Sequence, residues 1–206
     1  MKTLLCLLAV SPVLFLASCT TTSQVSLDYA SAPGHVRPGA SEFATQAFMD
    51  RRDVSSMHLG TVRTHVGTPL EYMQTRIPVA DVVTNAFGYG LEARGMLAPR
   101  SGARLIVTGE VLDMHCKLLV HPYAYAKIRV SILEAATGRV LYLGEYEGER
   151  QSRAFVPGSG SPVSILTRLA SGALQDAVDR ALDDPRMRAS VGTRLEETHG
   201  FNPTRI

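Results

Sequence analysis

The chain has 206 residues, of which 45% are hydrophobic, and it carries 21 Lys and Arg residues against 19 Asp and Glu residues. This length is enough for one domain of ordinary size with a hydrophobic core. The formal net charge of +2 gives no indication of binding to nucleic acid or to a strongly acidic lipid surface.

Residues 1–18 are predicted to form a cleaved signal peptide. They begin with one cation, Lys2, continue as an apolar run from Leu4 to Leu16, and end in small residues. The run contains Pro12 and is shorter than the roughly 20 apolar residues that a membrane-spanning helix needs. We therefore expect this segment to be removed during secretion.

The sequence Leu16-Ala17-Ser18-Cys19 resembles the lipobox of bacterial lipoproteins. This resemblance implies cleavage before Cys19, which then carries a diacylglycerol and an N-acyl group, with fatty acids such as palmitate. Several acyl chains give stable anchoring, whereas a single chain binds a membrane only weakly. The next residue is Thr20 and not the Asp that retains lipoproteins at the inner membrane, so the resemblance implies the periplasmic face of the outer membrane. The alternative is an ordinary secreted protein in which Cys19 is a spare thiol.

The segment from Cys19 to residue 40 is predicted to be a flexible tether that lets the domain stand off the membrane. It is polar, is rich in Pro and Gly towards its end, and shows no sustained apolar period. Residues 185–206 are charged, lack a consistent helical stripe and are expected to form a loose tail. A single domain is therefore expected over residues 41–184.

Two helices are predicted within this domain. The first begins near Pro78 and ends near Gly95, with apolar residues at three-to-four spacing and Asp81 in its first turn. The second begins with Ser161 as N-cap and Pro162 in the first turn, and it stops at about residue 183.

Five strands are predicted, over residues 42–50, 57–65, 104–115, 123–133 and 139–149. The last two should form a hairpin across the turn at residues 135–138. The elements predict an α+β fold: a two-layer sandwich with a mainly antiparallel sheet of about five strands and both helices on one face.

The strand at 123–133 has a clear period of two, which places four polar or aromatic side chains on one face. These are Tyr123, Tyr125, Lys127 and Arg129. Exposed Tyr and Arg are enriched where proteins meet partners, so this row is a candidate partner surface. The alternative is an ordinary solvated sheet face.

The remaining polar clusters predict no catalytic, metal or cofactor site. Asp113, His115, Cys116 and His121 lack the spacing of a zinc site, and neighbours on a strand point to opposite faces. Ser55, Ser56, His58 and Asp53 fit a polar turn, and the Gly-Ser segment 158–161 lacks the Lys of a phosphate-binding loop. With Cys6 discarded and Cys19 lipidated, Cys116 has no partner for an internal disulfide.

Three segments resemble the YajG-like family of small bacterial outer-membrane lipoproteins, whose function is uncharacterised. They are residues 48–52 with Asp50 and Arg52, residues 59–63 with Gly60, and the helix at 78–95. The resemblance extends over about residues 42–184. It departs from the family pattern in a longer insert at 64–76 and in the connection at 113–122.

Together these features predict a non-catalytic, lipid-anchored envelope protein that binds a protein partner or associates with itself. The first alternative is a carrier that holds an apolar ligand between sheet and helices, which requires a cavity of several hundred Å³ lined by apolar side chains. The second is a hydrolase acting on envelope polymers, which requires a pocket with Asp, Glu, His or Ser in hydrogen-bond reach.

Overall fold

Three long strands form the centre of the sheet: β6 (Leu105–Leu118), β7 (Pro122–Glu134) and β8 (Val140–Gln151). The computed structural model describes residues 20–30, 42–153, 155–156, 158, 160–187 and 189. Buried and half-buried residues alternate without interruption along β7, as its period of two predicted. The hairpin between β7 and β8 is confirmed, and its turn contains Gly138 at a φ of 71°, a conformation that favours glycine.

The second edge of β6 pairs with three short strands in succession. These are β2 (Phe43–Thr45), β3 (Met49–Asp50) and β4 (His58–Arg63), and all three run parallel to β6. Strand β5 (Pro69–Thr75) folds back antiparallel to β4, and β1 (Thr21–Val25) pairs parallel to β5 at the edge.

The sheet therefore has eight strands and is mixed, so the prediction of about five mainly antiparallel strands was wrong in number and direction. The segment 42–50 forms two strands because the chain leaves β6 near Phe48. The backbone N–H of Phe48 donates to Thr84 Oγ1 at 3.0 Å, and its ring stacks on Phe87. The long insert at 64–76 contains β5, which turns back from β4 at Gly67, where φ is 91°.

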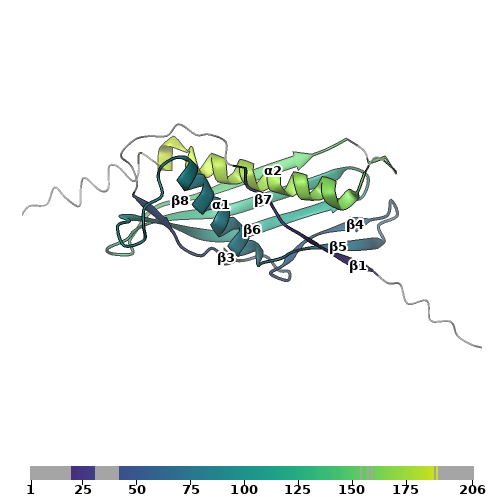
Figure 1. The fold of residues 1–206 in the computed structure, drawn as a ribbon, viewed down its shortest axis with the longest axis horizontal. Helices are drawn as coiled ribbons and strands as arrows, with labels where there is room; N and C mark the ends of the chain where they lie inside the picture. Colours follow the sequence, from purple (N-terminus) through teal and green to yellow (C-terminus); the bar gives the residue numbers. More distant parts are fainter. Residues whose placement is uncertain are drawn as a thin grey trace, which may run out of the picture.

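Both predicted helices are confirmed, as α1 (Val79–Ala93) and α2 (Pro162–Leu182), and they cover the same face of the sheet (Figure 1). Helix α2 lies along β8 and β7, and α1 packs beside it over β6 and the short parallel strands. The backbones of α2 and β8 lie close together at Gly148, where a Cβ atom would lie 1.9 Å from the carbonyl oxygen of Ala173.

The segment after β1 is part of the domain, which corrects the prediction of a flexible tether for residues 21–30. It crosses the helix layer (Figure 1), where the Tyr29 hydroxyl donates to Asp179 at 2.6 Å and the Asp28 N–H to Ser171 at 3.1 Å. Val25, Leu27 and Tyr29 alternate with polar residues, and all three pack against the core. The alternation covers only three apolar residues within a polar segment, so the sequence alone did not predict that this segment packs against the domain. Residues 31–40 lie outside the described residues.

At the C-terminal end, residues 185–187 and 189 are helical, and Met187 is buried against the core. The loose tail predicted to start at residue 185 therefore begins later than expected. The other residues of that segment lie outside the described part of the chain.

We predict that Gly148→Ala destabilises the domain by about 2 kcal/mol, because an added methyl group forces α2 away from β8. Urea unfolding measures the change. The matched control is Gly88→Ala in α1, where an added Cβ meets nothing within 4 Å. That substitution should stabilise the helix by up to about 1 kcal/mol. Equal unfolding midpoints for the two variants would contradict the close approach.

Candidate functional site

Neither α1 nor α2 covers the outward face of β6, β7 and β8, because both pack on the other side (Figure 1). We call this surface the open sheet face. The strand register places the four predicted surface residues on it, side by side with outward residues of β6 and β8. Its side chains include Thr108, Glu110, Asp113, His115, Lys117, Tyr123, Tyr125, Lys127, Arg129, Ser131, Leu143, Glu145, Glu147 and Glu149.

Ion pairs cross the three strands in the middle of the open sheet face. Arg129 lies 2.6 Å from Glu110 on β6 and 2.7 Å from Glu145 on β8. Lys127 lies 2.9 Å from Glu147 and 3.3 Å from Glu145. Arg129 is thus held between carboxylates of β6 and β8, and Lys127 between two carboxylates of β8, so both cations of β7 are paired.

The pKa directions agree with this pairing. Hydrogen bonds from Arg129 and Lys127 lower the pKa of Glu145, and those from Lys127 and Tyr125 lower the pKa of Glu147. The same two carboxylates, Glu147 first, raise the pKa of Lys127. Glu145, Glu147, Lys127 and Arg129 are therefore all charged at neutral pH, and their ion pairs persist.

One end of the open sheet face is aromatic. The His115 ring lies 5.9 Å from the ring centres of both Tyr123 and Tyr125, and its Nδ1 atom is 2.9 Å from Asp113 Oδ1. Burial and then the hydrogen bond to Glu147 raise the pKa of Tyr125, so its hydroxyl stays protonated with its proton directed to Glu147, and its oxygen can accept from a partner. The predicted row therefore divides into a tyrosine pair and a pair of bound cations.

A shallow hollow of about 410 Å³ lies beside the paired cations. Met49 of β3 and Leu143 of β8 line it and are 51% and 59% exposed. Nothing in the predicted surface row indicated this hollow, because Met49 belongs to a strand whose pairing with β6 was not foreseen.

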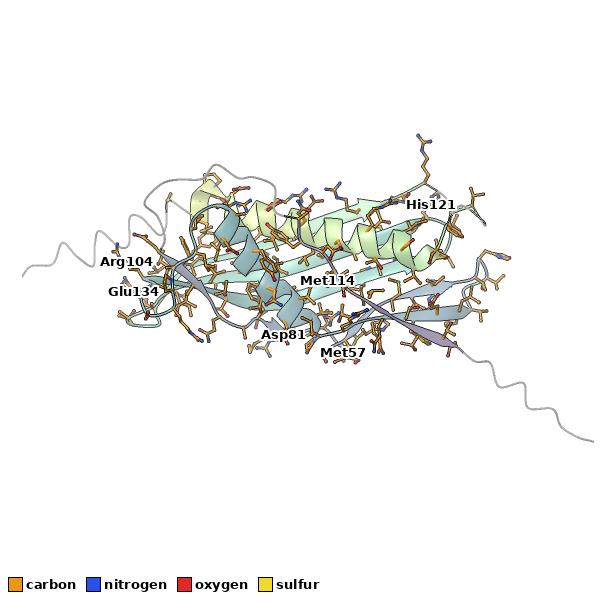
Figure 2. The ribbon with its side chains drawn as sticks, viewed as in Figure 1. Met57, Asp81, Arg104, Met114, His121 and Glu134 are labelled. Carbon is orange, nitrogen blue, oxygen red and sulfur yellow. The ribbon has the colours of Figure 1, made fainter. Side chains whose placement is uncertain are left out.

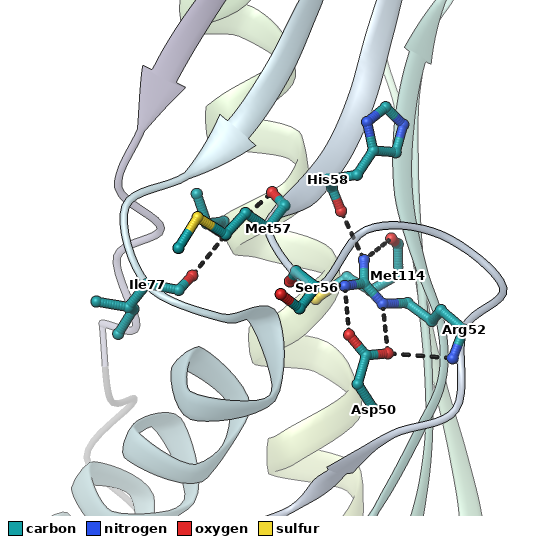
Figure 3. A network of polar contacts seen from close by, with 8 residues as sticks. Asp50, Arg52, Ser56, Met57, His58, Ile77 and Met114 are labelled. Atoms are coloured by element: carbon teal, nitrogen blue, oxygen red, sulfur yellow. Dashed lines mark hydrogen bonds and ion pairs between the residues drawn. The ribbon is translucent and has the colours of Figure 1, made fainter.

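The two family-pattern residues Asp50 and Arg52 form a nearly buried ion pair at the end of β3 (Figure 3). Arg52 Nε donates to Asp50 Oδ1 at 2.9 Å and its Nη2 to Oδ2 at 2.7 Å. The same guanidinium donates to the carbonyl oxygens of Ser56, His58 and Met114. Its side chain is 4% exposed. One arginine thus ties together the end of β3, the start of β4 and the middle of β6.

Gly60, the third family-pattern residue, lies on β4 opposite Cys116. A Cβ atom at this position would lie 2.0 Å from the Cys116 carbonyl oxygen, so only glycine lets β4 approach β6 here. Asp50, Arg52 and Gly60 therefore meet at one structural junction, where they hold the short parallel strands against β6.

His115 and Cys116 point to opposite faces of β6, as strand geometry requires. Cys116 is buried 3.8 Å from the sulfur of Met73, and burial raises the pKa of its thiol to about 12. Within the described ranges, no group of three or more His, Cys, Asp or Glu residues is placed to hold a metal ion.

A buried polar cluster that sequence reasoning missed joins the N-terminal segment to both helices. Arg94, after α1, is 3.0 Å from Asp179 and 2.8 Å from Asp183 of the α2 end, and Asp179 accepts from Tyr29. Burial, followed by the Asp179 hydrogen bond, raises the pKa of Tyr29 to about 12. The cluster fixes residues 26–30 across the helices. Its partners are too far apart in sequence for any spacing rule to reveal.

Two further cavities bear on the carrier alternative. One, of about 820 Å³, is lined by Arg150, Ser164 and Arg168 together with apolar residues such as Val25 and Leu169. The other, of about 340 Å³, lies beside residues 25–29, α1 and Tyr89. Both are bordered by the N-terminal segment: residues 25, 26, 28 and 30 line the first, and residues 25–27 and 29 line the second. Between the helices and the sheet, core side chains such as Val107 and Ile128 are fully buried.

Cys19 lies outside the described residues, so its predicted lipidation is not observed. None of the helices in the described part of the chain is long and apolar enough to cross a membrane.

No family model matches the sequence, and no curated protein is significantly similar to it. Among solved structures, protein XCC0632 from Xanthomonas campestris, described as DUF330, superposes with a TM-score of 0.62 at 13% identity. The match covers 84% of this chain and 99% of that one. The two proteins share a fold.

Weaker likenesses extend to two further bacterial proteins. A candidate homologue of neuraminyllactose-binding hemagglutinin from Helicobacter pylori gives a TM-score of 0.43 at 9% identity, covering 84% of this chain and 100% of that one. A candidate lipoprotein from Caulobacter crescentus gives 0.40 at 8% identity, covering 56% and 83%. Neither carries an argument about function.

We predict that Asp50→Asn costs about 3 kcal/mol of stability at pH 7, because it leaves the buried Arg52 cation without its counter-charge. Burial opposes ionisation of Asp50, but the Arg52 hydrogen bonds outweigh it and lower the pKa of this carboxyl. The ion pair therefore contributes fully to the free energy of unfolding above about pH 4, the ordinary range of a free carboxyl. This contribution is lost as the pH falls further.

Urea unfolding at pH 7 and pH 3 measures this difference, which should shrink at the lower pH. The matched control is Asp53→Asn, which changes an exposed carboxylate in the same loop. Equal stability of the two variants at pH 7 would show that the Asp50–Arg52 ion pair does not stabilise the domain.

Proposed function

We propose that this chain is a lipoprotein of the bacterial cell envelope, anchored through Cys19 to the periplasmic face of the outer membrane. It acts without catalysis, by binding a protein partner on the open sheet face. The observation that carries the location is the lipobox-like sequence Leu16–Cys19 after an apolar run. The YajG-like pattern at Asp50, Arg52 and Gly60 supports the same class.

The open sheet face supports the mode of action. Three long strands present one broad side that neither helix covers. Its cations Lys127 and Arg129 are already bound by Glu110, Glu145 and Glu147, so a strongly acidic partner gains little there. The contact points that remain are the Tyr123–Tyr125 pair and the hollow with Met49 and Leu143. These fit a protein surface with apolar and hydrogen-bonding groups.

The carrier alternative requires a cavity between sheet and helices. The two cavities near the helices border the N-terminal segment, whereas core side chains between helices and sheet such as Val107 and Ile128 are fully buried, which favours partner binding over ligand carriage.

Cys19→Ser should move the protein from the membrane fraction to the soluble fraction, because two or three acyl chains provide most of the membrane affinity. Fractionation of cells followed by detection of the protein measures this. Cys6→Ser is the matched control, since Cys6 lies in the predicted signal peptide and its loss should leave the protein at the membrane. If Cys19→Ser stayed in the membrane fraction, the anchor would be disproved.

Photoreactive residues placed at Tyr123, Tyr125 and Arg129 should crosslink a protein partner, or a second copy of the chain, in intact envelopes. The matched control is a photoreactive residue at Tyr89, which is 58% exposed on α1 and therefore on the helix side. Mass spectrometry of the crosslinked products identifies what is bound. Crosslinking at position 89 alone would place the partner on the helix layer and contradict the proposal.

A further inference from the structure

Four chain segments meet at one end of the sheet. Because β4 runs parallel to β6, the turn after Arg63 and the turn after Leu118 lie at the same end. The end of β8 pairs there with Tyr123, and the start of β1 pairs there with β5. We call this end the entry end and define it as residues 20–22, 63–70, 117–123, 151–153 and 155–156. It lies at the right in Figure 1, and His121 marks it in Figure 2.

The turns of the entry end expose large apolar side chains. Val66, at the tip of the β4–β5 turn, is 74% exposed, and Val120, at the tip of the β6–β7 turn, is 53% exposed. Leu119 and Val156 are also exposed, and the neighbouring Phe155 N–H donates to the Val120 carbonyl oxygen at 3.2 Å. Exposed apolar groups from separate turns thus gather on one surface, as is typical of sites that contact membranes or other proteins.

The charged side chains within these segments are cationic. The sequence segments 63–70, 117–123 and 151–156 contain Arg63, Lys117 and Arg153 and no Asp or Glu, and the next carboxylates along the strands are Glu71, opposite Thr21, and Glu149 on β8. Arg63 donates to the carbonyl oxygen of Gly67 at 3.0 Å, and the Lys117 ammonium lies 5.3 Å from the centre of the Tyr123 ring. These cations therefore differ from Lys127 and Arg129, which are bound by carboxylates. Apolar tips with a basic rim complement a leaflet that contains anionic phospholipid.

The position of the predicted lipid leads to the same surface. Cys19 precedes the first residue of β1, Thr21, by two positions, which an extended chain spans in about 7 Å. Strand β1 is hydrogen-bonded to β5, and the segment after it is held by Tyr29 and Asp179. A lipid on Cys19 therefore enters the membrane directly beside the entry end, with no free tether between them.

We propose that the entry end is a membrane-docking surface, at which Val66, Leu119 and Val120 enter an anionic phospholipid leaflet beside the lipid on Cys19. Arg63, Lys117 and Arg153 contact the lipid phosphates around them. The long axis of the domain then points away from the membrane. The open sheet face stands perpendicular to the membrane plane and is accessible to a neighbouring protein. This inference rests on the proposed lipidation of Cys19.

The test uses full-length lipidated protein in vesicles of phosphatidylethanolamine and phosphatidylglycerol. A polarity-sensitive fluorophore is attached to Val120→Cys or, as matched control, to Val140→Cys. Val140 is 50% exposed, almost as much as Val120, but lies at the opposite end of the sheet, next to the β7–β8 turn. Labelling is specific, because Cys116 is 1% exposed and Cys19 is blocked by its lipid.

At position 120 the emission should shift to shorter wavelength, and lipids with a quencher on the acyl chain should reduce it. At position 140 neither change should occur. Vesicles of neutral phosphatidylcholine should weaken the shift at position 120, as should the double variant Lys117→Gln with Arg153→Gln on the anionic vesicles.

Equal quenching at both positions, or none at position 120 in vesicle-bound protein, would overturn the docking surface while leaving the anchor intact. A second result would also overturn the proposal: an emission shift at position 120 that grows with the number of protein molecules per vesicle but is not quenched by the lipids. It would assign the entry end to contact between two copies of the chain. Protein that fails to stay with the vesicles at all would contradict the lipid anchor itself, so the two failures give different results.

Discussion

The fold depends on how the second edge of β6 is closed. Buried backbone N–H and C=O groups must be paired, and β6 presents a long row of them on the side away from β7. No single strand covers this edge, which is shared by β2, β3 and β4. The chain must leave and rejoin β6 between these strands, and the Arg52 side chain bridges one such break by hydrogen bonds to Asp50, His58 and Met114. The parallel half of the sheet, including β5 and β1, is attached through this junction.

Much of the antiparallel half was predictable from sequence, because its signals are local. The period of two in β7, the turn at Gly138 and the apolar stripes after Pro78 and Pro162 each lie within one element. The parallel half was not predictable from sequence. The direction of each strand, and the strand with which it pairs, depend on where the chain returns to the sheet after a connection. β1, at the edge, and β5, next to it, are short and carry polar residues on one side, so neither has a pattern that differs clearly from that of a loop.

The same distinction holds for the candidate site. That Tyr123, Tyr125, Lys127 and Arg129 share a face follows from alternation alone. That the two cations are bound by Glu110, Glu145 and Glu147 follows only from the register of three strands. Likewise, the nearly balanced net charge says nothing about the entry end. There, Arg63 at the end of β4, Lys117 near the end of β6 and Arg153 after β8 come from segments without Asp or Glu. A chain can be close to neutral overall and still present two surfaces with quite different electrostatics.

The N-terminal segment connects location with function. A flexible tether would let the domain take any orientation, so the position of the open sheet face relative to a membrane would have no meaning. A segment that forms β1 and is then held by Tyr29, Asp179 and Arg94 removes that freedom. An anchor at Cys19 would then act on the edge strand of the sheet itself, and the domain would keep one end near the lipid. The open sheet face would meet partners sideways, at a fixed height above the leaflet, which favours another membrane-bound protein over a freely diffusing one.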